Sequence, residues 1–113
     1  MKSLFSAIME QQNHNICHRD IKPENILVEV NAQNEVTACK LADFGLARKV
    51  DSKDKKSLTD CCGTPIYVAP EVLSGEGYSL PCDMWSLGIV MFVCITGEPP
   101  FYNTDKFALF KLI

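Results

Sequence analysis

The hydrophobic pattern of this chain predicts one helix that is apolar on every face. It runs from about Leu80 to Thr96. Ser79 stands where an N-cap is expected, Pro81 suits the first turn, and Gly97 marks the end of the helix. A helix that is apolar all round is buried all round, so we expect it to be the central helix of a larger helical body.

Three further helical segments are expected. The periodicity of residues 2–12 predicts an amphipathic helix with its apolar side chains on one side. These side chains are Leu4, Phe5, Ile8 and Met9. Pro70–Leu73 has room for a single helical turn, and Thr104 is expected to cap a short helix at Asp105–Ile113.

Two short strands and a loop complete the predicted elements. The runs Ile26–Val30 and Val36–Leu41 predict a short β-hairpin whose turn is the polar segment 31–34. Residues 51–60 are polar, carry charges of both signs, and predict an exposed, mobile loop. The fold class is therefore α+β and mainly helical. Because these elements cover only part of the central helix, we expect the chain to be a piece of a larger domain.

The composition excludes several classes of protein. Hydrophobic residues make up 47% of the chain and charged residues 22%, which is typical of a folded domain. The net charge of −3 argues against a broad surface for nucleic acid or anionic membranes. The longest apolar run, Leu87–Ile95, is too short to cross a bilayer, and residues 1–12 lack a signal-peptide cleavage site. We expect no nucleic-acid partner and no membrane span.

The chain has six cysteines, but their spacing matches neither a redox motif nor a metal site. No C-x-x-C pair and no cysteine–histidine spacing of a zinc site occurs. The cysteines are Cys17, Cys39, Cys61, Cys62, Cys82 and Cys94. We interpret them as reduced, buried thiols of an intracellular protein, in the cytoplasm or the nucleus.

Three clusters of chemically active residues follow one another along the chain. They are His18–Asn25, Asp43-Phe44-Gly45 and Gly63–Glu71. A site that transfers a phosphoryl group needs a carboxylate for the hydroxyl proton, oxygen ligands for Mg²⁺ and a cation near the moving charge. All of these residue types occur in the three clusters.

Four residues supply these groups. Asp20 is the candidate carboxylate and Lys22 the candidate cation. Residues two apart on an extended segment point to the same side, so both side chains are expected to face one pocket. Asn25 and Asp43 supply the hard oxygen ligands that Mg²⁺ prefers.

In this order, the clusters resemble the catalytic loop, the metal-binding motif and the end of the activation segment of eukaryotic protein kinases. The resemblance covers the whole chain, residues 1–113, and corresponds to the middle of the large, C-terminal kinase lobe. It implies a partial kinase domain with ATP and Mg²⁺ as cofactors. The parent protein would transfer the γ-phosphoryl group of ATP to serine and threonine hydroxyls of protein substrates.

Particular residues indicate a class and a group within the family. Lys22 in D-x-K-P-E-N is similar to the serine/threonine class, as is Thr64, whose counterpart bonds to the catalytic Asp and Lys. Cys62–Leu73 and Cys82–Gly88 resemble the calcium/calmodulin-dependent-kinase-like group, which includes checkpoint and MAP-kinase-activated relatives.

The resemblance also implies structural roles. Asp83 resembles the aspartate that bonds to the catalytic-loop backbone, and a buried carboxylate needs such donors. His18 and Phe44 resemble two members of the hydrophobic spine, and Gly45 completes the metal-binding motif. Leu27 resembles the residue that packs beneath the adenine.

Other positions are acidic or depart from the family. Glu24 resembles the residue that contacts basic substrates, and Glu71 the carboxylate that pairs with an arginine. Gln11 and Gln12 stand where the family often has a Leu-His pair. Within these residues we find no glycine-rich loop and no lysine for the nucleotide phosphates, so the parent protein requires an N-terminal lobe that this chain lacks.

Asp60 is a candidate regulatory residue. Many relatives carry a phosphorylatable threonine four residues before the counterpart of Thr64, and Arg19 would receive that phosphate. We expect the Asp60 carboxylate to replace part of the phosphate charge. Alternatively, Asp60 is an ordinary solvated residue and control passes to Thr59 or Ser57.

Two hypotheses for function remain. In the first, the chain is a fragment of an active serine/threonine kinase and is inactive alone. In the second, it is a short, catalytically inactive product that acts as a binding or decoy module. The first is favoured because Asp20, Lys22, Asn25, Asp43 and Thr64 are all intact, and a decoy has no chemical need for them.

Overall fold

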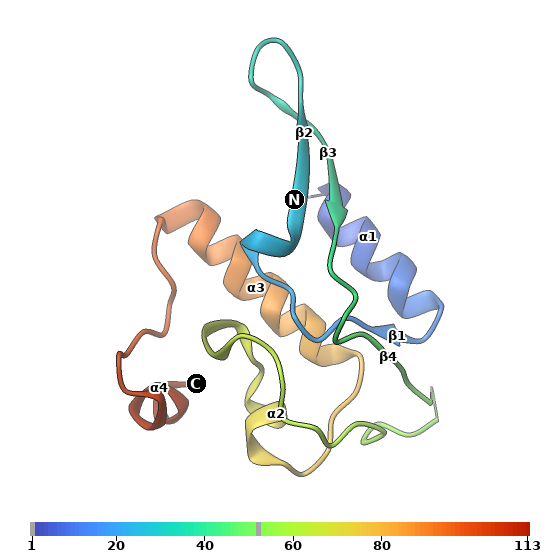
Figure 1. Cartoon of the computed structure of the whole chain (residues 1–113), viewed down its shortest axis with the longest axis vertical. Coiled ribbons are helices and arrows are strands. Elements are labelled where there is room, and N and C mark those ends of the chain that lie inside the picture. Colours follow the sequence, from blue (N-terminus) through green and yellow to red (C-terminus); the bar gives the residue numbers. More distant parts are fainter. Residues whose placement is uncertain (1, 52) are drawn as a thin grey trace.

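The computed structural model describes residues 2–51 and 53–113, so Met1, and Ser52 of the predicted loop, lie outside the described residues. Within these ranges the chain forms four α-helices, two short 3₁₀ helices and two two-stranded antiparallel sheets (Figure 1). In chain order they are α1 (Lys2–Asn13), β1 (Ile16–Cys17), η1 (Pro23–Asn25), β2 (Ile26–Val30), β3 (Val36–Leu41), β4 (Arg48–Lys49), η2 (Pro65–Tyr67), α2 (Pro70–Ser74), α3 (Pro81–Thr96) and α4 (Lys106–Leu112). The α+β class is confirmed.

Helix α3 crosses the centre of the molecule (Figure 1). Its Leu87 and Val90 pack with Leu4, Ile8 and Ile21 into one buried cluster. A second buried cluster lies at its N-terminal end and consists of Cys17, Val50, Leu58, Val68, Ala69, Val72, Tyr78 and Cys82. The helix therefore joins two small cores and gives a rigid support to the loops between them.

The ends of α3 differ in how well they were predicted. Gly97 ends the helix with φ 84°, and its N–H donates to the Val93 carbonyl, as the glycine signal indicates. Ser79 is not the N-cap, because Leu80 occupies that position with a helical backbone and no side-chain hydrogen bond. The Ser79 carbonyl instead accepts the Cys82 N–H at 3.3 Å, so a tight backbone turn starts the helix.

Much of the second half of α3 is exposed, which agrees with the expectation that the elements of this chain cover only part of the apolar helix. Ile95 is 80% exposed, and Met91 and Phe92 are also exposed. The whole chain exposes 7009 Å², against about 6,200 Å² expected for a compact monomer of its mass. Within this half Ile89 and Val90 are buried, but the described elements leave most of the other apolar side chains at least partly exposed.

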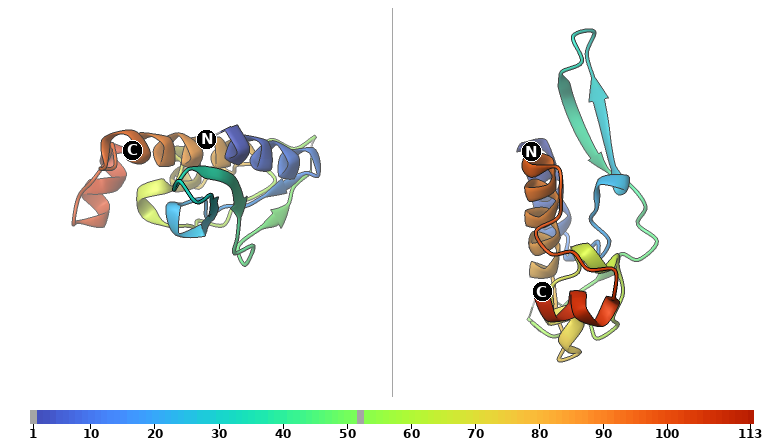
Figure 2. Two further views of the ribbon diagram at one scale, coloured as in Figure 1. Left: turned by 90° about the horizontal axis from the view of Figure 1, so that it is seen from above. Right: turned by 90° about the vertical axis from the view of Figure 1, so that its left-hand side faces the viewer.

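The β2–β3 hairpin has the predicted bounds and projects from the body of the molecule (Figures 1 and 2). Ile26 opposes Leu41, and the register shifts between Glu29 and Val30. Helix α1 packs against β3 at the base of the hairpin. Exposed apolar side chains line both strands: Leu27, Val28, Val30 and Val36.

The terminal helices were predicted with small errors. In α1, Leu4 and Ile8 are buried, whereas Phe5 and Met9 are exposed. Helix α4 is capped by Asp105, whose carboxylate accepts the Ala108 N–H at 2.7 Å. The cap is therefore not Thr104, and the helix starts one residue later than expected.

The predicted exposure of the charged loop and the predicted burial of the cysteines agree with the structure only in part. Of the predicted exposed loop 51–60, residues 51, 53–56, 59 and 60 are exposed, as expected. The prediction is wrong for Leu58, which is buried and pairs with Tyr78. All six cysteines are free thiols, but Cys61 and Cys94 are exposed, so the prediction of buried thiols is wrong for these two. No described helix is long and apolar enough to span a membrane.

Candidate functional site

The segment after β1 is anchored by a buried carboxylate at the start of α3. Asp83 is fully buried and accepts the backbone N–H groups of His18 at 2.7 Å and Arg19 at 2.9 Å. Burial raises the pKa of Asp83, and the two backbone hydrogen bonds oppose that shift. Because both bonds reach adjacent residues, Asp83 fixes the direction in which the chain enters the loop.

The same helix holds the third cluster. Ser86, one turn after Asp83, donates its hydroxyl to the Tyr67 carbonyl at 2.7 Å. Residue Gly63 approaches the loop from the other side, with φ 100°. A Cβ at this position would lie 2.6 Å from the Arg19 carbonyl oxygen, so only glycine allows the two segments to come so close.

Arg19 turns its side chain into the interior. Its backbone has φ 70°, in the left-handed region, and its side chain is only 3% exposed. The guanidinium donates to the Leu46 carbonyl at 2.7 Å and to the Tyr78 hydroxyl at 3.1 Å. Its Nη1 lies 3.6 Å from Asp60, whose side chain is 76% exposed. Burial lowers the pKa of Arg19, but the contacts with Tyr78 and Asp60 outweigh this effect and the guanidinium stays charged.

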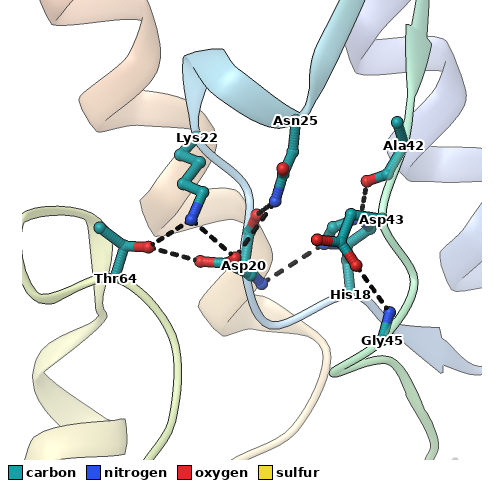
Figure 3. Close-up of polar contacts among 8 residues, drawn as sticks. All are labelled: His18, Asp20, Lys22, Asn25, Ala42, Asp43, Gly45 and Thr64. Atoms are coloured by element: carbon teal, nitrogen blue, oxygen red, sulfur yellow. Dashed lines mark hydrogen bonds and ion pairs between the residues drawn. The ribbon is translucent and has the colours of Figure 1, made fainter.

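Asp20, Lys22 and Thr64 form a triangle of polar contacts (Figure 3). The Thr64 hydroxyl donates to Asp20 Oδ1 at 2.7 Å, and Lys22 Nζ lies 3.0 Å from Asp20 Oδ2. Lys22 Nζ also donates to the Thr64 hydroxyl at 2.9 Å. The structure thus brings Asp20 and Lys22 to one side of the extended segment, as the spacing predicts, and adds a residue more than forty positions away.

Asn25 completes the cluster from the end of η1. Its amide nitrogen donates to the Asp20 carbonyl at 2.9 Å and to Asp20 Oδ2 at 3.1 Å. Its amide oxygen accepts no hydrogen bond from the described part of the chain, so it is free to bind a cation. Oxygen atoms of this kind suit Mg²⁺.

The charge state of the cluster follows from these contacts. Burial raises the pKa of Asp20, but hydrogen bonds from Thr64, Lys22 and Asn25 outweigh it, and the net pKa is lowered. The Asp20 hydrogen bond raises the pKa of Lys22, and the nearby Asp43 carboxylate adds to this shift. The site therefore holds an ionised carboxylate beside an ammonium group at neutral pH.

The second cluster, Asp43-Phe44-Gly45, is in contact with His18 of the first cluster. His18 is fully buried, its Nε2 donates to the Ala42 carbonyl at 3.0 Å, and its ring lies 4.9 Å from the Phe44 ring. Asp43 is exposed, has φ 57°, and accepts the Gly45 N–H at 3.1 Å (Figure 3). Its second carboxylate oxygen accepts no hydrogen bond from the described residues and remains available to a cation.

Three predicted residues lie outside this cluster. Leu27 is 58% exposed on β2, and Glu24 is exposed on η1. Glu71, in the first turn of α2, is partly exposed and makes no ion pair within the described ranges. Water can therefore solvate the Glu71 carboxylate, so the chain avoids the cost of an unpaired buried charge.

The sequence analysis assigned no role in the site to three residues that shape it: Gly63, Tyr78 and Ser86. Tyr78 is buried, accepts a hydrogen bond from Arg19 and donates to the Asp60 carbonyl at 2.6 Å. A glycine directly before Thr64 was a signal for a close backbone approach. Tyr78 and Ser86 carry no local signal, because their partners are distant in the sequence.

Comparisons with known proteins find related sequences over nearly the whole chain. A family model described as protein kinase domain matches residues 1–112. The chain is 48% identical over 109 residues to MAP kinase-activated protein kinase 2 of Cricetulus longicaudatus, covering 96% of this chain and 32% of that protein. It is 44% identical over 117 residues to serine/threonine-protein kinase 33 of Bos taurus, covering 100% and 24%. It is 45% identical over 112 residues to serine/threonine-protein kinase DCLK3 of Mus musculus, covering 97% and 14%. The chain thus spans a third or less of the length of these relatives.

Proposed function

Because this chain belongs to the protein kinase family, we propose that it forms the catalytic part of the large lobe of a serine/threonine kinase. The complete kinase transfers the γ-phosphoryl group of ATP to serine and threonine hydroxyls of proteins. The contact triangle of Asp20, Lys22 and Thr64 is the observation that carries this proposal. It combines an ionised carboxylate with a cation, which are the groups that phosphoryl transfer needs from the protein.

In this mechanism Asp20 accepts the hydrogen bond of the substrate hydroxyl and takes its proton as transfer proceeds. Its lowered pKa makes it a weak base, so its main work is to orient the hydroxyl oxygen. Lys22 places a positive charge next to Asp20, where charge on the transferring group is stabilised. Thr64 holds the Asp20 and Lys22 side chains in position through its hydroxyl group.

Asn25 and Asp43 would hold Mg²⁺ through their free oxygen atoms. The bound ion neutralises the phosphate charges of ATP. Leu27, exposed on β2, would lie beneath the adenine, and Glu24 would contact basic residues of the substrate. These 113 residues contain no glycine-rich loop, so the kinase needs a small lobe supplied from elsewhere and the isolated chain should be inactive.

A chimeric kinase tests the proposal. In it, this chain replaces the matching segment of the MAP kinase-activated protein kinase 2 of Cricetulus longicaudatus. We expect the chimera to transfer labelled phosphate from ATP to a peptide with one serine and basic neighbours, and the isolated chain to transfer none. A chimera that melts cooperatively and binds Mg·ATP, yet transfers nothing, would contradict the proposal and favour the binding or decoy function.

The role of Asp60 leads to a separate prediction. The Arg19–Asp60 contact is exposed on the Asp60 side, and such pairs contribute at most about 1 kcal/mol. In the chimera, Asp60→Ala should therefore lower activity by no more than about fivefold. Arg19→Ala should lower it further, because it also removes the contacts with Leu46 and Tyr78.

Phosphatase treatment of the same chimera provides the control. If Asp60 replaces part of an activating phosphate, dephosphorylation should leave most of the activity. If it instead removes most of the activity while Asp60→Ala changes nothing, control lies with a phosphorylated neighbour. Thr59 is exposed and is then the residue to test.

A further inference from the structure

Two buried thiols lie in contact beneath the catalytic segment. Cys17 Sγ and Cys82 Sγ are 3.4 Å apart, and the two residues are 0% and 4% exposed. Cys17 directly precedes His18, and Cys82 directly precedes Asp83. The thiols therefore sit at the junction where Asp83 holds the His18 and Arg19 backbone.

We propose that Cys17 and Cys82 form an intramolecular disulfide when the protein meets hydrogen peroxide, and that this bond fastens β1 to the start of α3. The proposal concerns the thiols alone and does not depend on the proposed kinase activity. A disulfide needs two cysteines whose side chains point toward each other across a short distance. The 3.4 Å contact between the two sulfur atoms shows that Cys17 and Cys82 point toward each other.

The same cluster is a poor metal site. Cys17, Cys82 and Asp83 place one ligand atom each within 4.8 Å of one another. Both carboxylate oxygens of Asp83 already accept backbone N–H groups, however. Only two thiols remain, whereas structural zinc sites use four protein ligands. The chemistry left to the pair is therefore oxidation.

A small cavity borders one of the two thiols, Cys82. It is lined by Arg19, Cys62, Val68, Ala69, Val72, Tyr78, Cys82 and Ser86, and has a volume of about 10 Å³, close to that of one water molecule. Cys62 is partly exposed at this cavity, whereas Cys17 does not line it. We therefore assign the first oxidation to Cys82, which borders this cavity, and not to Cys17, which does not.

The reaction balances without any further reagent. The Cys82 sulfur attacks one peroxide oxygen, the O–O bond breaks, and water leaves as Cys82 becomes a sulfenic acid. The Cys17 sulfur then attacks the Cys82 sulfur, and the S–O bond breaks as the S–S bond forms. The departing hydroxide takes the Cys17 proton and leaves as a second water. Two thiols and one peroxide give one disulfide and two waters.

Burial makes the Cys17 thiol slow to react. The Cys82 hydrogen bond and burial raise the pKa of Cys17, and the Asp83 carboxylate adds to the effect. Cys17 is therefore a protonated, slow thiol in the reduced protein. The attack of Cys17 on the oxidised Cys82 is therefore also slow, and it depends on the contact between the two sulfur atoms.

Peptide mapping of the full chain tests the proposal. The reduced protein is treated with hydrogen peroxide in native buffer, the peroxide is removed, the remaining thiols are alkylated in denaturant so that buried thiols also react, and the peptides are analysed by mass spectrometry. We expect one predominant cross-linked peptide that joins Cys17 to Cys82, with loss of alkylation at both and recovery after dithiothreitol. Cys94→Ser, at an exposed cysteine, should leave this cross-link unchanged.

Two further samples make the result decisive. Cys82→Ser should abolish the cross-link and leave Cys17 fully alkylated. Wild-type protein oxidised in denaturant should lose the preference for Cys17–Cys82, because the pairing depends on the fold. If Cys17 and Cys82 stay alkylated in native buffer while Cys61, Cys62 or Cys94 are oxidised, the proposal is wrong.

Discussion

Asp20→Asn in the chimeric kinase should lower kcat by about 10²- to 10⁴-fold, the range of a general acid–base contribution. Asparagine has the shape of aspartate and can still accept the Thr64 hydroxyl hydrogen bond, which is 2.7 Å long in the wild type. It cannot take a proton, and its NH₂ group places a donor where Lys22 and Asn25 also donate. The loss should therefore appear in turnover, as measured with saturating peptide and ATP.

Asp54→Asn is the matched control for this prediction. Asp54 is exposed and its carboxylate accepts the N–H of Lys56, so the substitution changes the same charge away from the triangle. We expect it to leave kcat within twofold or so of the wild type, as for other exposed sites. An Asp20→Asn chimera that turns over at the rate of the Asp54→Asn chimera would show that Asp20 has no role in the chemical step.

Asp83→Ala should lower the free energy of unfolding of the chimera by roughly 2–6 kcal/mol. The substitution leaves two buried N–H groups, of His18 and Arg19, without an acceptor, and each orphaned donor costs about 1–3 kcal/mol. Denaturant unfolding followed by circular dichroism measures the change.

Asp54→Ala serves here as the control, because its carboxylate also accepts a backbone N–H but water can replace it. The control should unfold close to the wild-type midpoint. If both variants lose the same small amount of stability, the Asp83 contacts do not hold the segment together.

Local sequence patterns predicted elements whose stabilising contacts are local or repeated. The hairpin has the predicted bounds, because Ile26–Val30 and Val36–Leu41 pair across a short polar turn. Helix α3 was placed within one residue by its apolar run, Pro81 and Gly97. The pattern could not show that the second half of α3 is exposed, because burial depends on neighbours and not on the helix itself.

Elements that form between residues far apart in the sequence were not predicted. Strands β1 and β4 have two residues each and pair Ile16 with Lys49 and Cys17 with Arg48. A strand of two residues is too short to show an alternation of apolar and polar side chains, and its partner strand lies more than thirty residues away in the sequence. The same applies to the bridge between Leu58 and Tyr78, which fixes the end of the charged loop.

The candidate site was also predicted only in part. Chemistry and spacing identified Asp20 and Lys22, and the resemblance to protein kinases added Thr64 as their partner. They could not identify the Leu46 carbonyl that receives Arg19, because every residue has a backbone carbonyl and nothing in the sequence distinguishes this one. Gly63 was visible as a glycine, but its partner, the Arg19 carbonyl, appears only when the two segments are folded together.

The affinity of the chimera for Mg·ATP, measured by calorimetry for Asp43→Asn and Asp20→Asn side by side, tests the central claim most directly. If Asp43 holds the metal and Asp20 orients the hydroxyl, Asp43→Asn should weaken Mg·ATP binding at least tenfold or so, the usual loss for a removed metal ligand or its support. Asp20→Asn should bind Mg·ATP like the wild type. Equal losses of affinity in both variants, or a loss confined to Asp20→Asn, would contradict the division of roles in this site.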